Sequence, residues 1–149
     1  MNAIPTAPRP GTPLWLRLLA LLLLAWNAFG LWVFFQQMTM SPADLARMTE
    51  AQRQLFEAMP GWIWMAYGVA VGAGSVGALA LLLGRRLALP LFVVSLVAVL
   101  AQCSQVFYPG GALQALGPKA ALPLPLTIIA VAIFQVWLAR RATIRDWLA

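Results

Sequence analysis

Four long apolar runs dominate this chain and leave few folds open to it. They cover residues 14–36, 61–84, 87–108 and 120–139, and each is close to the roughly 20 residues that cross a bilayer as a helix. Hydrophobic residues make up 62% of the sequence and charged residues 9%, too few charges to wet the surface of a soluble domain. Because lipid offers no hydrogen-bond partner, each run is expected to be an α-helix. We predict an all-α membrane protein, with a four-transmembrane-helix bundle formed by residues 14–149.

The basic residues predict how this bundle is oriented. The firmest markers are Arg85-Arg86, between the second and third runs, and Arg140-Arg141, after the fourth. Seven basic residues fall on the side of the N-terminus and three on the other side; the three are Arg47, Arg53 and Lys119. Cytoplasmic loops carry the excess of Lys and Arg. We therefore expect a bacterial inner-membrane protein with both termini in the cytoplasm. Residues 1–13, which contain four prolines, are expected to form a flexible cytoplasmic tail.

The connection between the first two runs is the longest polar stretch, and it predicts a periplasmic amphipathic helix over residues 42–59. Ser41 suits the N-cap, Pro42 the first helical position, and Asp44 follows three residues after the cap. Arg53 and Glu57 are spaced for an ion pair on one helix face. Such a helix could lie on the membrane as a lid over the bundle, which we favour, or present a docking surface to a partner.

Uncharged polar residues interrupt the apolar runs, mostly in the half that we expect to lie nearer the periplasm. They are Asn27, Tyr67, Gln102, Gln105, Tyr108 and Thr127, whereas Ser95 and Gln135 lie deeper toward the cytoplasm. One interpretation is an outward-facing pocket for a neutral hydroxylated ligand. The other, which we favour, is that these groups form hydrogen bonds between helices and fix their packing register. Convergence of Asn27, Tyr67, Gln102 and Gln105 on a cavity would favour the pocket, and pairwise bonds between helices would favour packing.

Small residues accumulate in the second run. Four glycines stand out, Gly68, Gly72, Gly74 and Gly77, and the first two form a GxxxG pattern that lets helices approach closely. We expect this helix to be the central packing element of the bundle or a dimer seam. These glycines do not form a nucleotide-binding loop, because no strand precedes them.

The residues that are missing exclude several kinds of chemistry. The chain has no His and one cysteine, Cys103, so His-based catalysis, a disulfide within the chain and a paired-cysteine redox site are ruled out. No acidic or basic residue lies in the middle of an apolar run, where proton-coupled carriers usually hold one. We expect no enzymatic activity, metal or cofactor, and the excess of arginine indicates topology, so we expect no nucleic-acid partner.

Several short runs resemble a family of small four-span proteobacterial inner-membrane proteins of unknown activity. The first is Trp26-Asn27, and the second is Thr49-Glu50-Ala51-Gln52-Arg53 followed by Phe56 and by Pro60-Gly61-Trp62. The third is Gly77-Ala78-Leu79-Ala80-Leu81-Leu82-Leu83-Gly84-Arg85-Arg86. The resemblance covers most of the chain and implies four spans. Members are often loosely labelled sugar transporters, and the resemblance supplies no catalytic or binding residue.

Two functions are compatible with these features. We expect a non-enzymatic scaffold or accessory subunit that binds other membrane proteins through the glycine-rich run or the periplasmic helix. The alternative is a carrier of small neutral solutes, working as a dimer because four short helices leave little room for a pathway within one chain. In either case the partners are the lipid bilayer and a membrane protein or a second copy of the chain.

Overall fold

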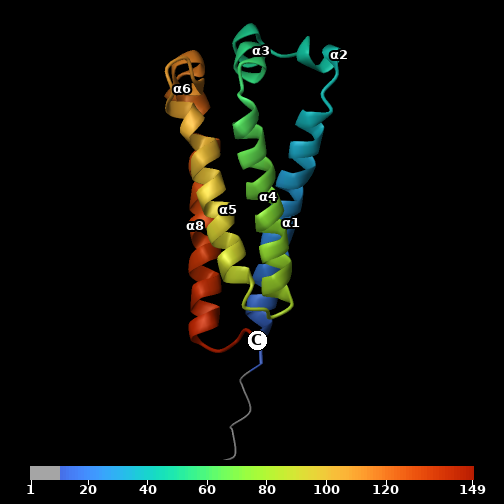
Figure 1. Ribbon diagram of the computed structural model, residues 1–149, viewed down its shortest axis with the longest axis vertical. Coiled ribbons are helices and arrows are strands. Elements are labelled where there is room, and N and C mark those ends of the chain that lie inside the picture. The colour runs from blue at the N-terminus through green and yellow to red at the C-terminus, as the bar shows by residue number, and fades with distance from the viewer. Residues whose placement is uncertain (1–10) are drawn as a thin grey trace, which may run out of the picture.

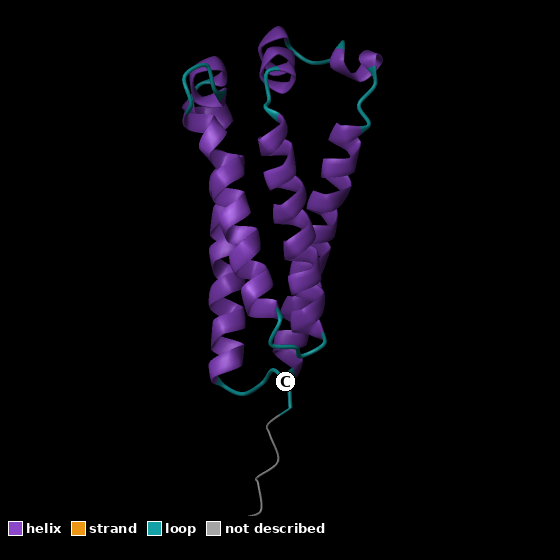
Figure 2. Ribbon diagram, in the orientation of Figure 1, coloured by secondary structure: helices purple, strands orange, loops and turns teal. Residues whose placement is uncertain are grey.

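Residues 11–149 are described by the computed structural model, and they form a bundle of four long helices that run alternately up and down (Figure 1). The long helices are α1 (Leu14–Met38), α4 (Gly61–Leu82), α5 (Ala88–Cys103) and α8 (Pro123–Ile144). The described residues contain no strand (Figure 2). Four segments are long and apolar enough to cross a membrane, namely Leu14–Met38, Gly61–Leu82, Ala88–Phe107 and Pro118–Ile144. The predicted all-α, four-span architecture is confirmed.

Short helices connect the long ones at the end of the bundle away from the C-terminus, which we call the distal end (Figure 1). They are α2 (Pro42–Leu45), α3 (Glu50–Glu57), the 3₁₀ helix η1 (Ser104–Phe107), α6 (Ala112–Leu116) and α7 (Pro118–Ala121). The opposite end, which we call the terminal end, holds the α4–α5 turn, the first described residues and the C-terminus. The predicted tail, residues 1–13, lies mostly outside the described residues.

The predicted single helix over residues 42–59 is wrong, because the chain forms two short helices separated by a turn. Ser41 caps α2 as expected, and its backbone N–H donates to the Asp44 carboxylate over 3.1 Å. Thr49 then starts a new helix. The Gln52 N–H donates to Thr49 Oγ1 at 3.3 Å, and the Thr49 N–H donates to Gln52 Oε1 at 3.1 Å. This reciprocal capping box satisfies two backbone N–H groups. In a continuous helix, the same groups would donate to carbonyls of the preceding turn.

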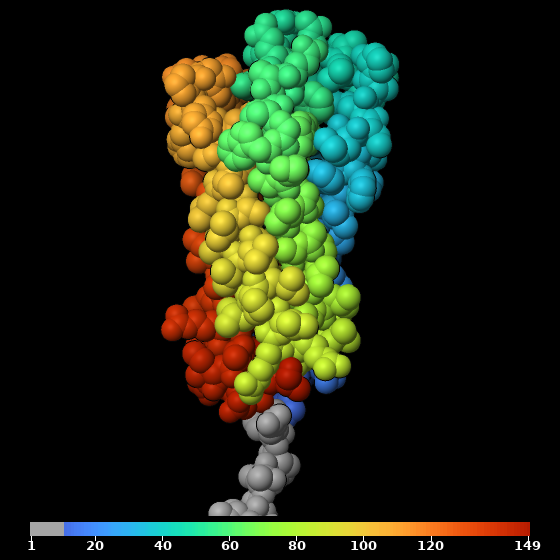
Figure 3. Space-filling view, viewed as in Figure 1, coloured from blue at the N-terminus to red at the C-terminus, as the bar shows by residue number. Residues whose placement is uncertain are grey.

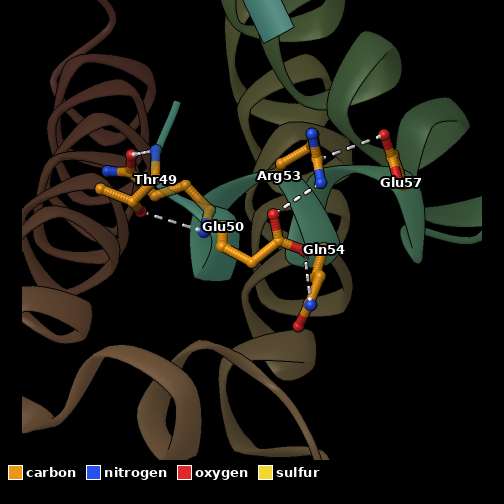
Figure 4. A network of polar contacts seen from close by, with 6 residues as sticks. Thr49, Glu50, Arg53, Gln54 and Glu57 are labelled. Atoms are coloured by element: carbon orange, nitrogen blue, oxygen red, sulfur yellow. Dashed lines mark hydrogen bonds and ion pairs between the residues drawn. The ribbon is translucent and has the colours of Figure 1, made fainter. Parts of the chain in front are cut away.

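The exposed face of α3 carries the expected ion pair within a larger network (Figure 4). Arg53 lies between two acids, with its Nη2 2.5 Å from Glu50 Oε2 and its Nε 3.9 Å from Glu57 Oε1. Gln54 also donates to Glu50 over 2.8 Å. Hydrogen bonds from Gln54 and Arg53 hold the pKa of the Glu50 carboxyl below its usual value. Because these side chains are exposed to solvent, the ion pairs contribute little to the stability of the fold.

The last two spans differ from the predicted runs at their ends. The third run, predicted to reach residue 108, ends its α-helix at Cys103 and tightens into η1. The fourth run was predicted over 120–139, but α8 continues past Arg140-Arg141 to Ile144. A helix can continue into the headgroup region because arginine side chains reach water there.

The long helices pack in the order α1, α4, α5, α8, so that α4 and α5 are central and α1 and α8 are not a closely packed pair. The larger core lies toward the terminal end. It is built mainly from leucine and alanine, with Phe92 as its largest side chain, and includes Leu16, Ala20, Leu23, Ala78, Leu81, Leu138, Ala139 and Ala142. Alanine lets neighbouring backbones approach closely, so this half of the bundle is tightly packed.

The terminal end is closed by the last three residues of the sequence. Gly84, at φ 68°, ends α4 in a Schellman motif, in which the Arg85 N–H donates to the Ala80 carbonyl over 2.8 Å. The Ala149 N–H donates to the Gly84 carbonyl over 2.6 Å, and Leu148 is buried in the core. In Figure 3 the end of the chain, in red, lies against the α4–α5 turn, in yellow-green.

Candidate functional site

A cavity of about 220 Å³ lies at the centre of the bundle, and all four long helices contribute to its walls. We call it the deep chamber. Three of the predicted polar residues line it, Asn27 from α1, Tyr67 from α4 and Gln102 from α5. The fourth polar residue in the wall is Gln135 of α8. The remaining walls are apolar and are formed by residues such as Phe29, Val71, Val99, Ile128 and Ala132.

Gln135 is the polar residue of the deep chamber that the predicted cluster did not include. Its side chain is 2% exposed, and its Nε2 has no hydrogen-bond partner among the described residues. A buried amide without a partner costs about 1–3 kcal/mol. The signal in the sequence was a polar residue near the middle of an apolar run, which Gln135 is in α8 as Asn27 is in α1.

Asn27 of α1 and Ser95 of α5 both lie next to Gly74 of α4. Asn27 Nδ2 donates to the Leu23 carbonyl of its own helix over 2.7 Å, and Ser95 Oγ donates to the Ala70 carbonyl of α4 over 2.7 Å. A Cβ at Gly74 would overlap Asn27 Oδ1 and lie 3.1 Å from Ser95 Oγ. Gly74 therefore makes the space that the Asn27 side chain occupies.

A second cavity of about 550 Å³, which we call the outer chamber, lies at the distal end, below α3 and α6. It shares five wall residues with the deep chamber, Val33, Tyr67, Gln102, Leu124 and Ile128, so the two chambers adjoin. Gln105 lines only the outer chamber, together with Gln37 and Gln52. The chambers therefore form one path from the distal end to the middle of the bundle.

Tyr67 stands where the two chambers meet, and aromatic neighbours hold its ring. The ring of Phe34, from α1, packs edge-on against it with centroids 5.1 Å apart. Trp64, one turn earlier in α4, stacks at 6.4 Å and itself contacts Phe56 of α3 at 5.3 Å. This row of four rings connects α3 to the shared wall of the two chambers.

The predicted polar set is thus only partly brought together. Tyr108 follows η1 and is 53% exposed, because the chain has left the helix that would have aligned it with Gln102 and Gln105. Thr127 is exposed on α8, where its hydroxyl donates to the Pro123 carbonyl over 2.8 Å. Neither lines the deep or the outer chamber. Tyr108 and Thr127 therefore lie apart from the polar residues that line the chambers.

The predicted glycine face is divided between two sides of α4. Gly68 lies beside Phe34 of α1, and Gly77 lies beside Phe92 of α5. Together with Gly74 they pack within the chain, in keeping with the central place of α4. Gly72 has no heavy atom within 4 Å of the position that a Cβ would take, so this glycine faces open space.

The arginines that mark the topology all lie at the terminal end. Arg140 and Arg141 are in the last turns of α8, and Arg141 lies over the Trp137 ring at 5.4 Å from its centre. Arg86 pairs with Asp146 over 2.9 Å and donates from its Nε to the Leu148 carbonyl over 3.1 Å. Arg85 lies in the same α4–α5 turn. The structural role of Arg86 in holding the C-terminal segment was not predicted.

The chemistry of the cavity is that of uncharged hydrogen bonding. No charged side chain lines either chamber, and the described residues contain no cluster of His, Cys, Asp or Glu that could hold a metal ion. Within the described residues no hydrogen bond joins Asn27, Tyr67, Gln102 and Gln105 to one another. These groups could hold a neutral molecule through hydroxyl or carbonyl groups, with its apolar surface against the aliphatic walls.

Comparison with models of protein families, with curated proteins and with solved structures finds no match to this chain. The functional argument therefore depends on the geometry of the cavity.

Proposed function

We propose that this protein binds a small uncharged solute in the deep and outer chambers and acts as a membrane carrier for it. The observation that carries this proposal is the convergence of Asn27, Tyr67, Gln102 and Gln135 on one central cavity that adjoins the distal end. Ligand sites are typically apolar cavities with a few polar groups that fix the orientation of the ligand. The cavity has this composition.

The main alternative explanation for these polar residues is that they hold the helices together, and the hydrogen bonds argue against it. Asn27 bonds to its own helix, and Gln135 leaves its amide nitrogen unpaired. Within residues 11–149, the bond from Ser95 to the Ala70 carbonyl of α4 is the one side-chain hydrogen bond that joins two of the long helices. A bundle that used its amides as structural links would satisfy them in pairs.

The arginine asymmetry extends the proposal to the cellular location. With the terminal end in the cytoplasm of a bacterium, the outer chamber opens toward the periplasm and the tightly packed core faces inward. A carrier must also reach a state that is open to the cytoplasm. We propose that this state separates the leucine and alanine contacts of the core, and that a dimer supports it. We also propose that the chain is a member of the small four-span proteobacterial family that its sequence resembles.

A second candidate function is that of a scaffold or accessory subunit without a solute. The observation that favours it is Gly72, which leaves an open, small-residue position on the outside of α4 where another helix could approach. A pull-down in mild detergent tests this function. A stable partner that is lost in Gly72→Leu would support a scaffold, and a chain that purifies alone would count against it.

Protection from thiol labelling tests the solute proposal. The reporter is Gln102→Cys in a Cys103→Ala background, reacted with a maleimide in nanodiscs, and the probes are glucose and phenyl glucoside. We expect phenyl glucoside to slow the labelling more than glucose does, because its ring can contact the apolar walls. Gln54→Cys in the same background is the matched control, since Gln54 is exposed on α3 outside the cavity.

Two outcomes of this experiment would contradict the proposal. A reporter that reacts only after denaturation would show that the chambers are closed to small molecules. If neither phenyl glucoside nor glucose changes the labelling rate, the cavity does not take an uncharged hydroxylated solute. Counterflow of a protecting compound in vesicles then separates a carrier, which exchanges it across the bilayer, from a protein that only binds it.

A further inference from the structure

The outside of the bundle carries a third cavity, between α1 and α8, that leads toward the deep chamber. It measures about 650 Å³, and we call it the lateral furrow. Its walls are Leu22, Leu23, Ala25 and Trp26 from α1, with Thr127, Ala130, Val131 and Phe134 from α8. Trp26 and Val131 also line the deep chamber. These two side chains, one on each helix, are therefore the residues shared by the walls of the lateral furrow and the deep chamber.

The helix pair beside the furrow is the most open side of the bundle. The pairs α1 and α4, α4 and α5, and α5 and α8 pack closely, whereas α1 and α8 do not. Among the described residues no hydrogen bond or ion pair joins α1 to α8. Trp26 is 39% exposed on this side. A movement of the Trp26 side chain would therefore join the furrow to the deep chamber without breaking a polar contact between helices.

The furrow faces hydrocarbon when the four helices span a membrane. Seven of its eight wall residues are apolar. The eighth, Thr127, donates its hydroxyl hydrogen to the Pro123 carbonyl of its own helix. A molecule that reaches the deep chamber by this route must first be soluble in lipid. Water-soluble sugars do not meet this condition, because their hydroxyl groups would be stripped of hydrogen bonds along the way.

At the inner end of this route lies the unpaired amide of Gln135. A primary amide offers both a donor and an acceptor, so a hydroxyl group of a ligand could accept from Nε2 and donate to Oε1. Charged headgroups are disfavoured, because no opposite charge lies in the wall of the chamber and an unpaired ion costs several kcal/mol there. The polar end of the ligand is therefore neutral and small.

We propose that the ligand is an uncharged amphiphile dissolved in the bilayer, an alcohol with a long apolar chain, that enters between α1 and α8. Its hydroxyl group binds Gln135 in the deep chamber, and its chain lies past Trp26 and Val131 in the lateral furrow. This inference rests on the proposed function, since it names the class of solute and its route of access. The outer chamber then serves for release toward the distal end.

Photolabelling in vesicles tests the proposal with a defined probe. The full chain is reconstituted in phosphatidylcholine vesicles containing a hexadecanol analogue that carries a diazirine on its chain, and labelled residues are identified by mass spectrometry. We expect labels on furrow residues of both α1 and α8 that unlabelled hexadecanol displaces. Hexadecane, which has the same chain and no hydroxyl group, should displace them poorly.

Two variants assign the binding to the named contacts. Gln135→Leu keeps the size of the side chain and removes the amide, so the apparent affinity should fall by about threefold to tenfold, the loss of one neutral hydrogen bond. The matched control is Gln36→Leu, because Gln36 is exposed on α1 and lines neither chamber nor the furrow. Val131→Trp should block the passage and abolish the displaceable label. Thermal unfolding of each variant identifies any that has failed to fold.

The outcomes separate this inference from the function on which it rests. Labelling that hexadecane displaces as well as hexadecanol, or that is unchanged in Gln135→Leu, would show ordinary lipid contact and overturn the inference. If hexadecanol does not bind while phenyl glucoside still protects Gln102→Cys, the cavity takes a water-soluble solute and only the inference fails. If neither compound binds, both proposals fail.

Discussion

Replacement of Gly74 by alanine should destabilise the bundle, although alanine is the better helix former. In the middle of a helix this exchange normally gains about 0.5–1 kcal/mol. Here the added methyl group would overlap Asn27 Oδ1 and lie 3.1 Å from Ser95 Oγ. Forcing extra volume into a packed site costs about 1–3 kcal/mol. The cost of the overlap therefore outweighs the gain in propensity, and we expect a net loss of up to about 2.5 kcal/mol in the free energy of unfolding.

Unfolding in mixed micelles with increasing sodium dodecyl sulfate, followed by circular dichroism, measures this loss. The matched control is Gly72→Ala on the same helix, where nothing lies within 4 Å and the stability should hold or rise slightly. Shortening Asn27 to alanine should make room for the new methyl group, so Gly74→Ala should cost at least about 1 kcal/mol less in the Asn27→Ala background. Equal stability of Gly74→Ala and Gly72→Ala would refute the contact between α1 and α4 on which this argument depends.

Three further predictions concern the ends of the bundle. Gly84→Ala should lower stability by about 1–2 kcal/mol in the same unfolding assay, because φ at Gly84 is 68°, whereas Gly61→Ala, at an open helix start, should not. The lowered pKa of the Glu50 carboxyl stabilises α3 at neutral pH, and this stabilisation is lost as the pH falls below about 4. The hydrogen-exchange protection factors of the α3 amides, taken relative to the intrinsic rate at each pH, should then fall while those of the spans do not change. An impermeant thiol reagent should label Gln54→Cys, in a Cys103→Ala background, from outside intact cells; labelling only after lysis would reverse the proposed orientation.

The spans could be predicted because a single physical demand decides them. A backbone in hydrocarbon must satisfy its own hydrogen bonds, so long uncharged apolar runs become helices whatever packs around them. The ends of these helices depend on weaker, local contacts. Thr49 and Gln52 are spaced as a capping box, which predicts a helix start at residue 50. The predicted single helix over residues 42–59 did not take this signal into account. The η1 segment has no comparable signal, since nothing in its sequence distinguishes it from the α-helix before it.

The candidate site was predicted in part, for a reason of geometry. Asn27, Tyr67 and Gln102 line one chamber, and their grouping in one region could be predicted by counting along each helix. Depth does not determine which side of a helix faces the bundle, and Thr127 faces outward. Gln135 was left out of the predicted cluster because the fourth run was expected to end at residue 139, which put Gln135 near its end, whereas α8 continues to Ile144.

The lateral furrow could not be predicted from the sequence. It depends on which helices are neighbours, and four apolar runs of similar composition do not specify an order of packing. The absence of a close α1–α8 contact follows from how the small residues of α4 hold α1 and α5 on its two sides. Such pairing is a property of the assembled bundle.

The closure made by Trp147–Ala149 has a consequence for biosynthesis. These residues are made after all four helices, and they join Gly84 and Arg86 of a turn that the ribosome completed some 60 residues earlier. The terminal end therefore cannot be sealed until α8 has left the translocon. During that interval the nascent chain holds its alanine-rich core together without these contacts, so its terminal end opens locally more easily than in the finished protein.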